Sequence, residues 1–417
     1  TGVRAPLGFG KAIDYRDSKI VGDIKYLWEP GRHLELVTLA LAYRITGQRQ
    51  YASGALELLQ SWFKQCPYPK GVHWISSLEL GIRLVNWAFT WHLLGGANSP
   101  LFATDEGKSF LDVWLTSIYQ HCHFINGHFS RYSSANNHLF GEYMGLFVAS
   151  ITWPCWPESE KWSKIAFDGL EEEAVRQNTI DGVNKEQAIY YQHEVMDMML
   201  ISHIVGATSS RRFSANFYNR FESLANFIAS IMDSSGNVPM IGDADDALMV
   251  RLSYSPRSSP YRSLLGACAV LFDRSDFKKH AGLFDEKNRL LFGEPGIVKW
   301  DALSNVGPST PQMTFPEGGY FILGSRFGHE DEVKAVFDCG PLGYLSIAAH
   351  GHADALALTL SVAGEQMLID PGTFAYHTEK VWRDYFRGTS AHNTIRVDQL
   401  NQSQIGGNFM WLSKATS

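Results

Sequence analysis

The stretch HGHADALALTLSVAGEQMLIDPGTFAY, residues 350–376, decides the fold class of the C-terminal part of the chain. Leu356, Leu358, Leu360 and Val362 recur at every second position, and side chains two residues apart share one face of a strand. A hairpin turn at Gly364-Glu365 would lead into a second alternating run through residue 369. The runs at 318–327, 332–340 and 392–400 alternate in the same way. We therefore predict an antiparallel sheet over residues 316–417, and we expect it to be incomplete because the chain ends at residue 417 without a closing element.

Before this region the apolar residues follow a helical period. Gly47 and Gly95 close two of these segments, as glycines close helices at their C-termini. Many segments are apolar on more than one face, which is typical of helices packed in layers or rings. We predict a helical domain over residues 1–280, a Gly- and Pro-rich linker over 281–315 and the sheet domain after it, an α+β multidomain chain. The expected helices cover residues 34–45, 51–63, 75–94, 110–119, 139–150, 162–175, 186–205, 213–232 and 261–272.

Composition excludes several classes of protein. At 417 residues the chain is larger than one core supports, and 36 Lys and Arg against 43 Asp and Glu argue against a general nucleic-acid binder. No apolar run reaches the roughly 18 residues of a membrane span. The five cysteines are scattered without a C-x-x-C pair, which argues against a disulfide framework or a thiolate zinc site. The sequence points to no organic cofactor and leaves the oligomeric state open. Because the chain starts at Thr1 without a Met or a signal segment, we expect it to be a fragment.

A possible metal site lies in the sheet region. His350 and His352 are two residues apart on an extended strand and would face one side. His352 with Asp370 on the paired strand, and His392 from a third segment, would form a His-Asp-His set suited to Zn²⁺ or Mn²⁺. The same residues would also serve as strand-end residues making local hydrogen bonds, and the spacing leaves both readings open.

A second polar cluster is SSANNHLFGEYMGL, residues 133–146. Asn136, Asn137 and His138 fall in the first turn of a helix, where the helix dipole favours an anion such as a carboxylate. Glu142, four residues after His138, would lie on the same face and could orient its ring. The alternative is an Asn N-cap with two solvated neighbours.

Three further motifs have both a chemical and a structural interpretation. EQAIYYQHEVMD, residues 186–197, carries Tyr190 and Tyr191, and a buried Tyr acts as an acid or base where cations lower its pKa, although most such residues belong to the core. GDADDA, residues 242–247, fits an Asp-rich turn or a carboxylate site. Trp28 with Arg32, and Arg83 further on, could stack on a sugar or pair with a carboxylate or sulfate, or could pack between helices.

The order of these motifs resembles the heparinase II/III family of polysaccharide lyases, which includes related alginate lyases. DIKYLWEPGRH at 23–33 and WRDYFRGTSAHNTIRVD at 382–398 match as well, so the resemblance covers nearly the whole chain. It implies an incomplete (α/α) toroid followed by an antiparallel, β-sandwich-like sheet domain. It also implies a periplasmic or secreted enzyme.

The resemblance assigns roles to individual residues. It implies that Asn137 and His138 bind the substrate carboxylate, that Tyr191 and His350 are catalytic, and that some members hold a metal on His352, Asp370 and His392. Tyr191 is preferred to Tyr190 because it lies five residues after Glu186, although Gln192 follows it where many members have His. The residues expected to contact substrate are Glu142, Trp28, Arg32, Arg83, Tyr190 and Arg387.

This residue set suits β-elimination at a uronate. Removing the C5 proton builds charge on the carboxylate, which Asn137 and His138 would stabilise. His350 or Tyr191 would take that proton, and Tyr191 would protonate the leaving oxygen. The metal would be structural. We expect an acidic polysaccharide substrate, in the first place a glycosaminoglycan (heparin or heparan sulfate, chondroitin sulfate or hyaluronan). The alternatives are alginate, a glycoside hydrolase acting through Asp243 and Glu142, and a glycan-binding protein without activity.

Overall fold

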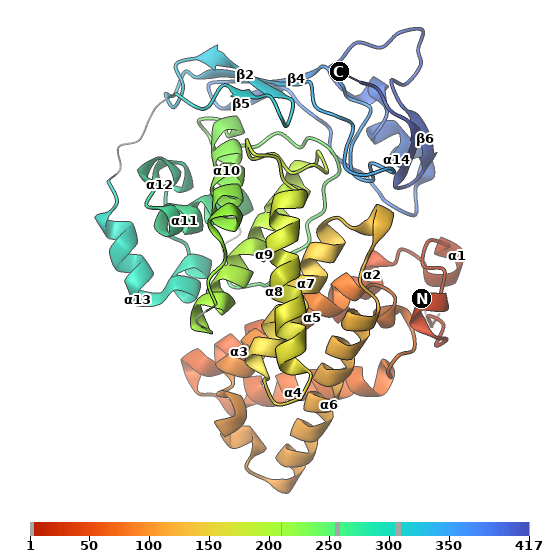
Figure 1. Ribbon diagram of the computed structural model, residues 1–417, viewed down its shortest axis with the longest axis vertical. Coiled ribbons are helices and arrows are strands. Elements are labelled where there is room, and N and C mark those ends of the chain that lie inside the picture. Colours follow the sequence, from red (N-terminus) through yellow and green to blue (C-terminus); the bar gives the residue numbers. More distant parts are fainter. Residues whose placement is uncertain (1–3, 210, 255–258, 305–309, 417) are drawn as a thin grey trace. The chain divides into compact units, whose positions relative to one another are not determined.

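The structure is a computed structural model that describes residues 4–209, 211–254, 259–304 and 310–416. The chain divides into two compact units. One comprises Thr1–Leu170 with Ala247–Leu252, and the other Glu171–Asp246 with Ser253–Ser417. The division falls inside a helix, so the second unit contains helices as well as the sheet (Figure 1).

The first unit is helical. Most of its predicted helices are present, and Gly47 adopts the left-handed conformation that closes the helix before it, as predicted. The helix predicted at 110–119 is longer than expected, because the Thr104 side chain caps its start. Its helices are α1 (Ser18–Val21), α2 (Lys25–Gly31), α3 (Leu34–Thr46), α4 (Arg49–Gln65), α5 (Ser77–Leu93), α6 (Asp105–Gly127), α7 (Asn137–Thr152) and the first part of α8 (Ser159–Arg176).

Glycines bring α5 and α7 into close contact. A Cβ added to Gly81 would lie 2.6 Å from the carbonyl oxygen of Gly141, and one added to Gly145 would lie 2.2 Å from Cα of Gly81. No side chain fits between backbones at this distance, so the crossing requires glycine. The crossing fixes α7, which begins with Asn137.

The second unit combines the remaining helices with the strands. The helices are α9 (Ile189–Thr208), α10 (Ala215–Ile231), α11 (Pro260–Phe272), α12 (Ser275–Ala281), α13 (Glu286–Ala302) and α14 (Lys380–Phe386). The strands are β1 (Thr314–Phe315), β2 (Tyr320–Ser325), β3 (Val333–Asp338), β4 (Ala357–Val362), β5 (Glu365–Leu368), β6 (Gln404–Gly407) and β7 (Met410–Ser413).

Among the described residues, β1 to β5 form one antiparallel sheet in sequence order, and β6 and β7 form a separate hairpin. The predicted hairpin after Val362 is confirmed, with Val362 opposite Glu365. The face of β4 with Ala357, Thr359 and Ser361 is the more buried one, while Val362 on the other face is 37% exposed. The alternating leucines therefore lie on the outer face of the sheet.

The inner face of the sheet packs on α10, at whose end the sheet lies in Figure 1. The ring of Phe227 on α10 lies 4.8 Å from that of Phe315 and 5.1 Å from that of Tyr320, measured between centroids. The strand ends that carry the predicted metal ligands belong to this same unit.

The predicted order of a helical region followed by an antiparallel sheet is confirmed. Two details are wrong. Residues 286–302 of the predicted linker form α13, which consists of two helical stretches joined by a kink at Gly293, where the backbone is non-helical. Residues 392–400 form no strand; they follow a short 3₁₀ turn and make bends. Gly307 and Pro308, also assigned to the linker, lie outside the described residues.

None of the helices in the described part of the chain combines the length and hydropathy that crossing a bilayer requires.

Candidate active site and metal centre

Tyr191 and His350 lie against each other in the second unit. Their rings stack with centroids 3.8 Å apart and planes 21° apart, and each residue is 5% exposed. Tyr191 is on the first turn of α9, and His350 precedes β4 by seven residues. The fold therefore joins a phenol and an imidazole that are 159 positions apart, which is an acid–base pair in chemical terms.

The backbone around Gly242 brings Asp243 to this pair. Gly242 has a φ of 72°, which favours glycine, and a Cβ there would lie 2.4 Å from the carbonyl oxygen of Gln187. The N–H of Ile189 donates to the carbonyl of Ile241, and the N–H of Asp243 to the carbonyl of His350. These contacts hold the start of α9, the 241–243 segment and His350 together.

Asp243 is a fully buried carboxylate shared by several donors. One oxygen accepts from Nδ1 of His350 at 3.1 Å and from Arg383 at 2.7 Å. The other accepts from Nε2 of His352 at 3.0 Å, from the Thr373 hydroxyl at 3.1 Å and from Arg383 again. Burial alone would raise the pKa of Asp243, but the Arg383 charge and these hydrogen bonds hold it well below its usual range.

The charge of Asp243 decides the tautomers of both histidines. A carboxylate can only accept, so His350 carries its proton on Nδ1 and His352 carries its proton on Nε2. The Nε2 lone pair of His350 is then available to take a proton. The Nε2 atom of His350 lies 3.6 Å from an oxygen of Glu186, which is within ion-pair distance once the ring is charged.

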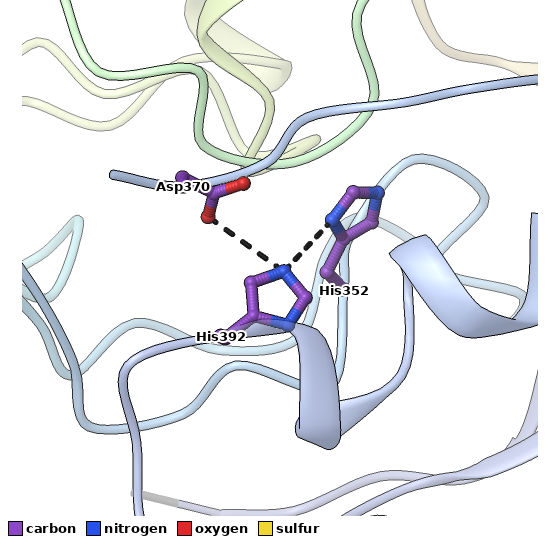
Figure 2. Close-up of side chains that lie close together, drawn as sticks. All are labelled: His352, Asp370 and His392. Carbon is purple, nitrogen blue, oxygen red and sulfur yellow. Dashed lines mark hydrogen bonds and ion pairs between the residues drawn. The ribbon is translucent and has the colours of Figure 1, made fainter. Parts of the chain in front are cut away.

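His352, Asp370 and His392 form the predicted group, and this grouping is confirmed. Nδ1 of His352 lies 3.2 Å from Nε2 of His392, which is 3.7 Å from an oxygen of Asp370 (Figure 2). All three residues are buried, and the atoms they offer lie within 4.8 Å of one another. A single divalent ion could bind all three.

The hydrogen bonds around this group suit a cation. His352 donates from Nε2 to Asp243, and His392 donates from Nδ1 to the carbonyl of Gly388 at 2.9 Å. Both nitrogens that face each other are then lone pairs with no proton between them, which is unfavourable unless a cation binds there. Burial lowers the pKa of His352 and lowers that of His392 to about 3, so both rings are neutral, as metal binding requires.

Buried carboxyls near this group also favour a bound cation. Burial raises the pKa of Asp370 to about 7 and that of Asp338 to about 6, and burial together with these two neighbours raises that of Asp354 well above its usual range. These raised pKa values mean that it costs free energy to ionise the buried carboxyls. A divalent cation would offset that cost, so the residues present fit a metal.

The other predicted polar cluster lies in the first unit. Asn136 caps α7 by accepting from the N–H of His138 at 3.2 Å, and Asn137 begins the helix with 1% of its surface exposed. His138 is half-buried. The cluster thus lies at a helix start, as predicted.

Glu142 does something other than predicted. Its oxygens accept from the N–H and the hydroxyl of Ser130 at 2.6 and 2.7 Å, and it has no exposed surface. Burial raises its pKa to about 7 despite these hydrogen bonds. Glu142 therefore holds the loop before α7, and its contact with substrate stays a prediction.

Three predicted substrate contacts in the first unit are core residues. Trp28 is buried and donates from its indole to the carbonyl of Val72 at 2.9 Å. Arg32 pairs with both oxygens of buried Glu79 at 2.8 Å. Arg83 has no exposed surface and donates to the carbonyl of Gly31 and to a ring nitrogen of His121. These long side chains cross-link helices in the core, and their contact with substrate stays a prediction.

Arg387 is also buried. It donates to the carbonyls of Asn408 and Met410 and lies 4.3 Å from the ring of Trp411. It fastens the end of α14 to the β6–β7 hairpin, and its contact with substrate stays a prediction. Tyr190 remains half-buried beside Tyr191, and its role stays a prediction.

Gln192, where the resemblance has His, is a structural residue. Its amide donates to the carbonyls of Gly182 and Leu224, and its oxygen accepts from the N–H of Asn184. Gln192, the residue that departs from the family pattern, is therefore part of the core.

Sequence reasoning missed Arg383 and Tyr376 and treated Asp243 mainly as a turn residue. Arg383 lies in α14, four residues before the predicted Arg387, which directly follows the helix, and the pairing with Asp243 tells the two apart. Tyr376 ends the opening motif and places its hydroxyl 3.1 Å from that of Tyr191. No local pattern marks such a pair.

The comparisons with known proteins agree with this architecture. The family model described as "Heparinase II/III N-terminus" matches residues 4–257, and "Heparinase II/III-like, C-terminal" matches residues 307–417. A heparin-sulfate lyase of Bacteroides thetaiotaomicron is 21% identical over 401 residues, covering 91% of this chain and 52% of the relative. A heparin-sulfate lyase of Pedobacter heparinus is 22% identical over 403 residues, covering 94% and 55%.

Two solved structures share the fold. The crystal structure of heparinase III aligns with a TM-score of 0.70 at 18% identity, covering 90% of this chain and 57% of that one. A heparan sulfate lyase mutant of Pedobacter heparinus aligns with a TM-score of 0.63 at 20% identity, covering 94% and 57%. The chain spans little more than half the length of the curated relatives it matches. Because the N-terminal family model alone covers more than half of its residues, the chain belongs to the heparinase II/III family.

Proposed function

We propose that this chain carries the catalytic residues of a polysaccharide lyase that cleaves uronate-containing glycosaminoglycan by β-elimination. The observation that carries the proposal is the Tyr191–His350 pair, whose imidazole is oriented by the buried carboxylate of Asp243. The relatives named heparin-sulfate lyase support heparin or heparan sulfate as the first substrate to test.

In the proposed reaction, His350 or Tyr191 removes the C5 proton of the uronate. The electrons of the C–H bond form the C4–C5 double bond, and the bond from C4 to the glycosidic oxygen breaks. With His350 as the base, Nε2 gains the proton and the resulting charge is balanced by Asp243 and Glu186. Tyr191 gives its proton to the leaving oxygen.

Asn137 and His138 are proposed to bind the substrate carboxylate, where negative charge develops as the C5 proton leaves. Backbone and side-chain donors at a helix start suit such a charge. This role rests on the family resemblance together with the position of both residues at the start of α7.

We propose that His352, Asp370 and His392 hold a structural Zn²⁺ or Mn²⁺ ion. The ion would supply positive charge among buried carboxyls and join the segments after β3, after β5 and after α14. Elimination needs no activated water, so the ion has no part in bond breaking in this proposal.

The alternatives are less well supported. A hydrolase using Asp243 as a general acid conflicts with its ion pair to Arg383, which keeps the carboxylate charged. Alginate remains the alternative substrate. A periplasmic or secreted location fits an enzyme that degrades extracellular polysaccharide, and it rests on the resemblance alone.

The test is to incubate the protein with heparan sulfate, chondroitin sulfate, hyaluronan and alginate and to follow ultraviolet absorbance. Elimination creates a conjugated unsaturated uronate that absorbs, whereas hydrolysis releases reducing ends without that signal. We expect absorbance with heparan sulfate, and we expect Tyr191→Phe to abolish it while the far-UV spectrum is unchanged. Reducing ends without absorbance would refute the lyase proposal, and activity in Tyr191→Phe would move the role to the neighbouring Tyr190.

A further inference from the structure

Tyr376 is held beside Tyr191 by contacts at both ends. Its ring lies 5.0 Å from the Arg383 guanidinium and 5.2 Å from the ring of Phe409. Its backbone carbonyl accepts from the Asn408 amide at 2.7 Å. Tyr376 is only 8% exposed, so its ring and its hydroxyl oxygen are held in place, while the O–H bond can still rotate.

The hydrogen bonds of this hydroxyl give its direction. The Tyr376 oxygen lies 3.0 Å from the carbonyl oxygen of Ala244 and 3.1 Å from the oxygen of Tyr191. A carbonyl can only accept, so Tyr376 donates its one proton to Ala244. Tyr191 must then be the donor in the bond between the two phenols.

We propose that Tyr376 is a positioning residue for Tyr191. While Tyr191 is neutral, the Tyr376 oxygen accepts a hydrogen bond from the Tyr191 hydroxyl. When the Tyr191 oxygen carries a negative charge, the Tyr376 hydroxyl rotates and donates a hydrogen bond to it. The proton of Tyr376 never leaves it; only its acceptor changes, from the Ala244 carbonyl to the Tyr191 oxygen. This inference rests on the proposed function of Tyr191.

The surroundings of Tyr191 make such a donor necessary. Burial raises the pKa of Tyr191 well above the usual value, and the charges of an ionised Tyr376 and of the neighbouring carboxylates raise it further. A neutral Tyr376 has no such charge, and a hydrogen bond that it donates to the Tyr191 phenolate would lower this pKa. The groups that face it are Glu194 on its own helix, Asp243 and Asp245 on the segment after α10, His350 and Tyr376 before and after β4–β5, and Arg383 on α14. Three carboxylates against one guanidinium oppose a phenolate, so a hydrogen bond from Tyr376 is the contact that would offset them.

The role holds whichever group is the base. If Tyr191 removes the C5 proton, it must be ionised before the reaction. If His350 removes that proton and Tyr191 protonates the leaving oxygen, Tyr191 is ionised afterwards. A phenolate at this position occurs in both routes, and both need the Tyr376 hydroxyl.

The first test is the Tyr376→Phe variant, which keeps the ring against Arg383 and Phe409. We expect kcat on the preferred polysaccharide to fall about 10- to 100-fold with KM within twofold, because a hydrogen bond to a charged group is lost. In the profile of kcat against pH, the limb that reports the ionisation of Tyr191 should move to higher pH. Tyr385→Phe, which removes a hydroxyl from a half-exposed tyrosine on α14, is the matched control and should change neither quantity. A kcat within threefold of wild type and an unmoved pH limb would overturn the proposal.

The second test needs no substrate. Difluorotyrosine placed at position 191 ionises at lower pH than tyrosine, and its ¹⁹F resonance reports that ionisation directly. We expect the midpoint to rise by about one unit or more when Tyr376→Phe is added, and to stay unchanged with Tyr385→Phe. An equal midpoint in both backgrounds refutes the role of Tyr376 whatever the activity. A raised midpoint in a protein that makes no unsaturated uronate supports the role of Tyr376 and refutes the lyase function.

Discussion

The Asp243→Asn variant tests two roles of the Asp243 carboxylate, its ion pair with Arg383 and its hydrogen bonds to His350 and His352. The carboxylate offers two accepting oxygens and one negative charge, which balances the buried guanidinium of Arg383. An amide of the same shape offers one accepting oxygen and two donors and carries no charge. Arg383 keeps its hydrogen bonds to the Asn408 carbonyl but loses the negative charge that balances it. Removing one partner of a buried ion pair costs about 3–5 kcal/mol, so we expect the free energy of unfolding to fall by that amount.

The same variant must also disturb one of two histidines. If the new amide points its oxygen at His350, its NH₂ faces Nε2–H of His352 and forces that proton onto the nitrogen that would bind the metal. If it points its oxygen at His352, His350 loses its orienting acceptor and its Nε2 is no longer the available base. We therefore expect the variant to lose bound metal, or to lose at least about 100-fold in kcat, or both.

The assay combines urea unfolding, elemental analysis and the ultraviolet lyase assay on one preparation. Asp331→Asn is the matched control, because Asp331 also pairs with an arginine at 2.6 Å, but at the surface. Exposed pairs contribute little, so its unfolding midpoint should not move. An Asp243→Asn protein that kept wild-type stability, metal and activity would refute the reasoning about charge and tautomers.

Three other perturbations follow from the structure. Burial raises the pKa of Glu142 from 4.5 to about 7, so its contribution to stability is full below pH 4.5 and is lost as the pH rises through 7. The free energy of unfolding should fall by about 3 kcal/mol over this range in the wild type, and Glu142→Gln should remove this part of the pH dependence. Urea unfolding measured against pH checks this, and parallel curves for the two proteins would contradict it. His392→Ala should remove bound Zn²⁺ or Mn²⁺ and lower the thermal midpoint, while exposed His329→Ala should do neither; a metal-free, fully stable wild type would count against the site. Gly81→Ala should lower stability by about 1–3 kcal/mol because its Cβ meets the backbone of α7, whereas Gly54→Ala, with nothing closer than 3.8 Å, should be neutral or stabilising; equal urea midpoints would contradict the close packing of α5 and α7.

The sequence alone determined the succession of elements. Helical periods ending at glycines and the alternation in 350–376 are local properties, because the repeat of each element sets the spacing of its apolar side chains. The His-Asp-His grouping could also be predicted, since His352 and Asp370 flank one hairpin and the family motif supplies His392. The helix at 286–302 was missed because Gly293 and Pro295 are typical of linkers as well as of kinks.

Tertiary structure alone decided what the polar side chains do. The sequence gives Arg32, Arg83, Arg383 and Arg387 the same chemistry, yet a buried guanidinium takes its role from the partner that the fold supplies. For Arg83 that partner is a carbonyl and a ring nitrogen, and for Arg383 it is a carboxylate that also orients His350. Asp243 and Tyr376 acquire their roles from neighbours more than 50 positions away, since hydrogen bonds and ion pairs depend on distance in space and not on distance along the chain.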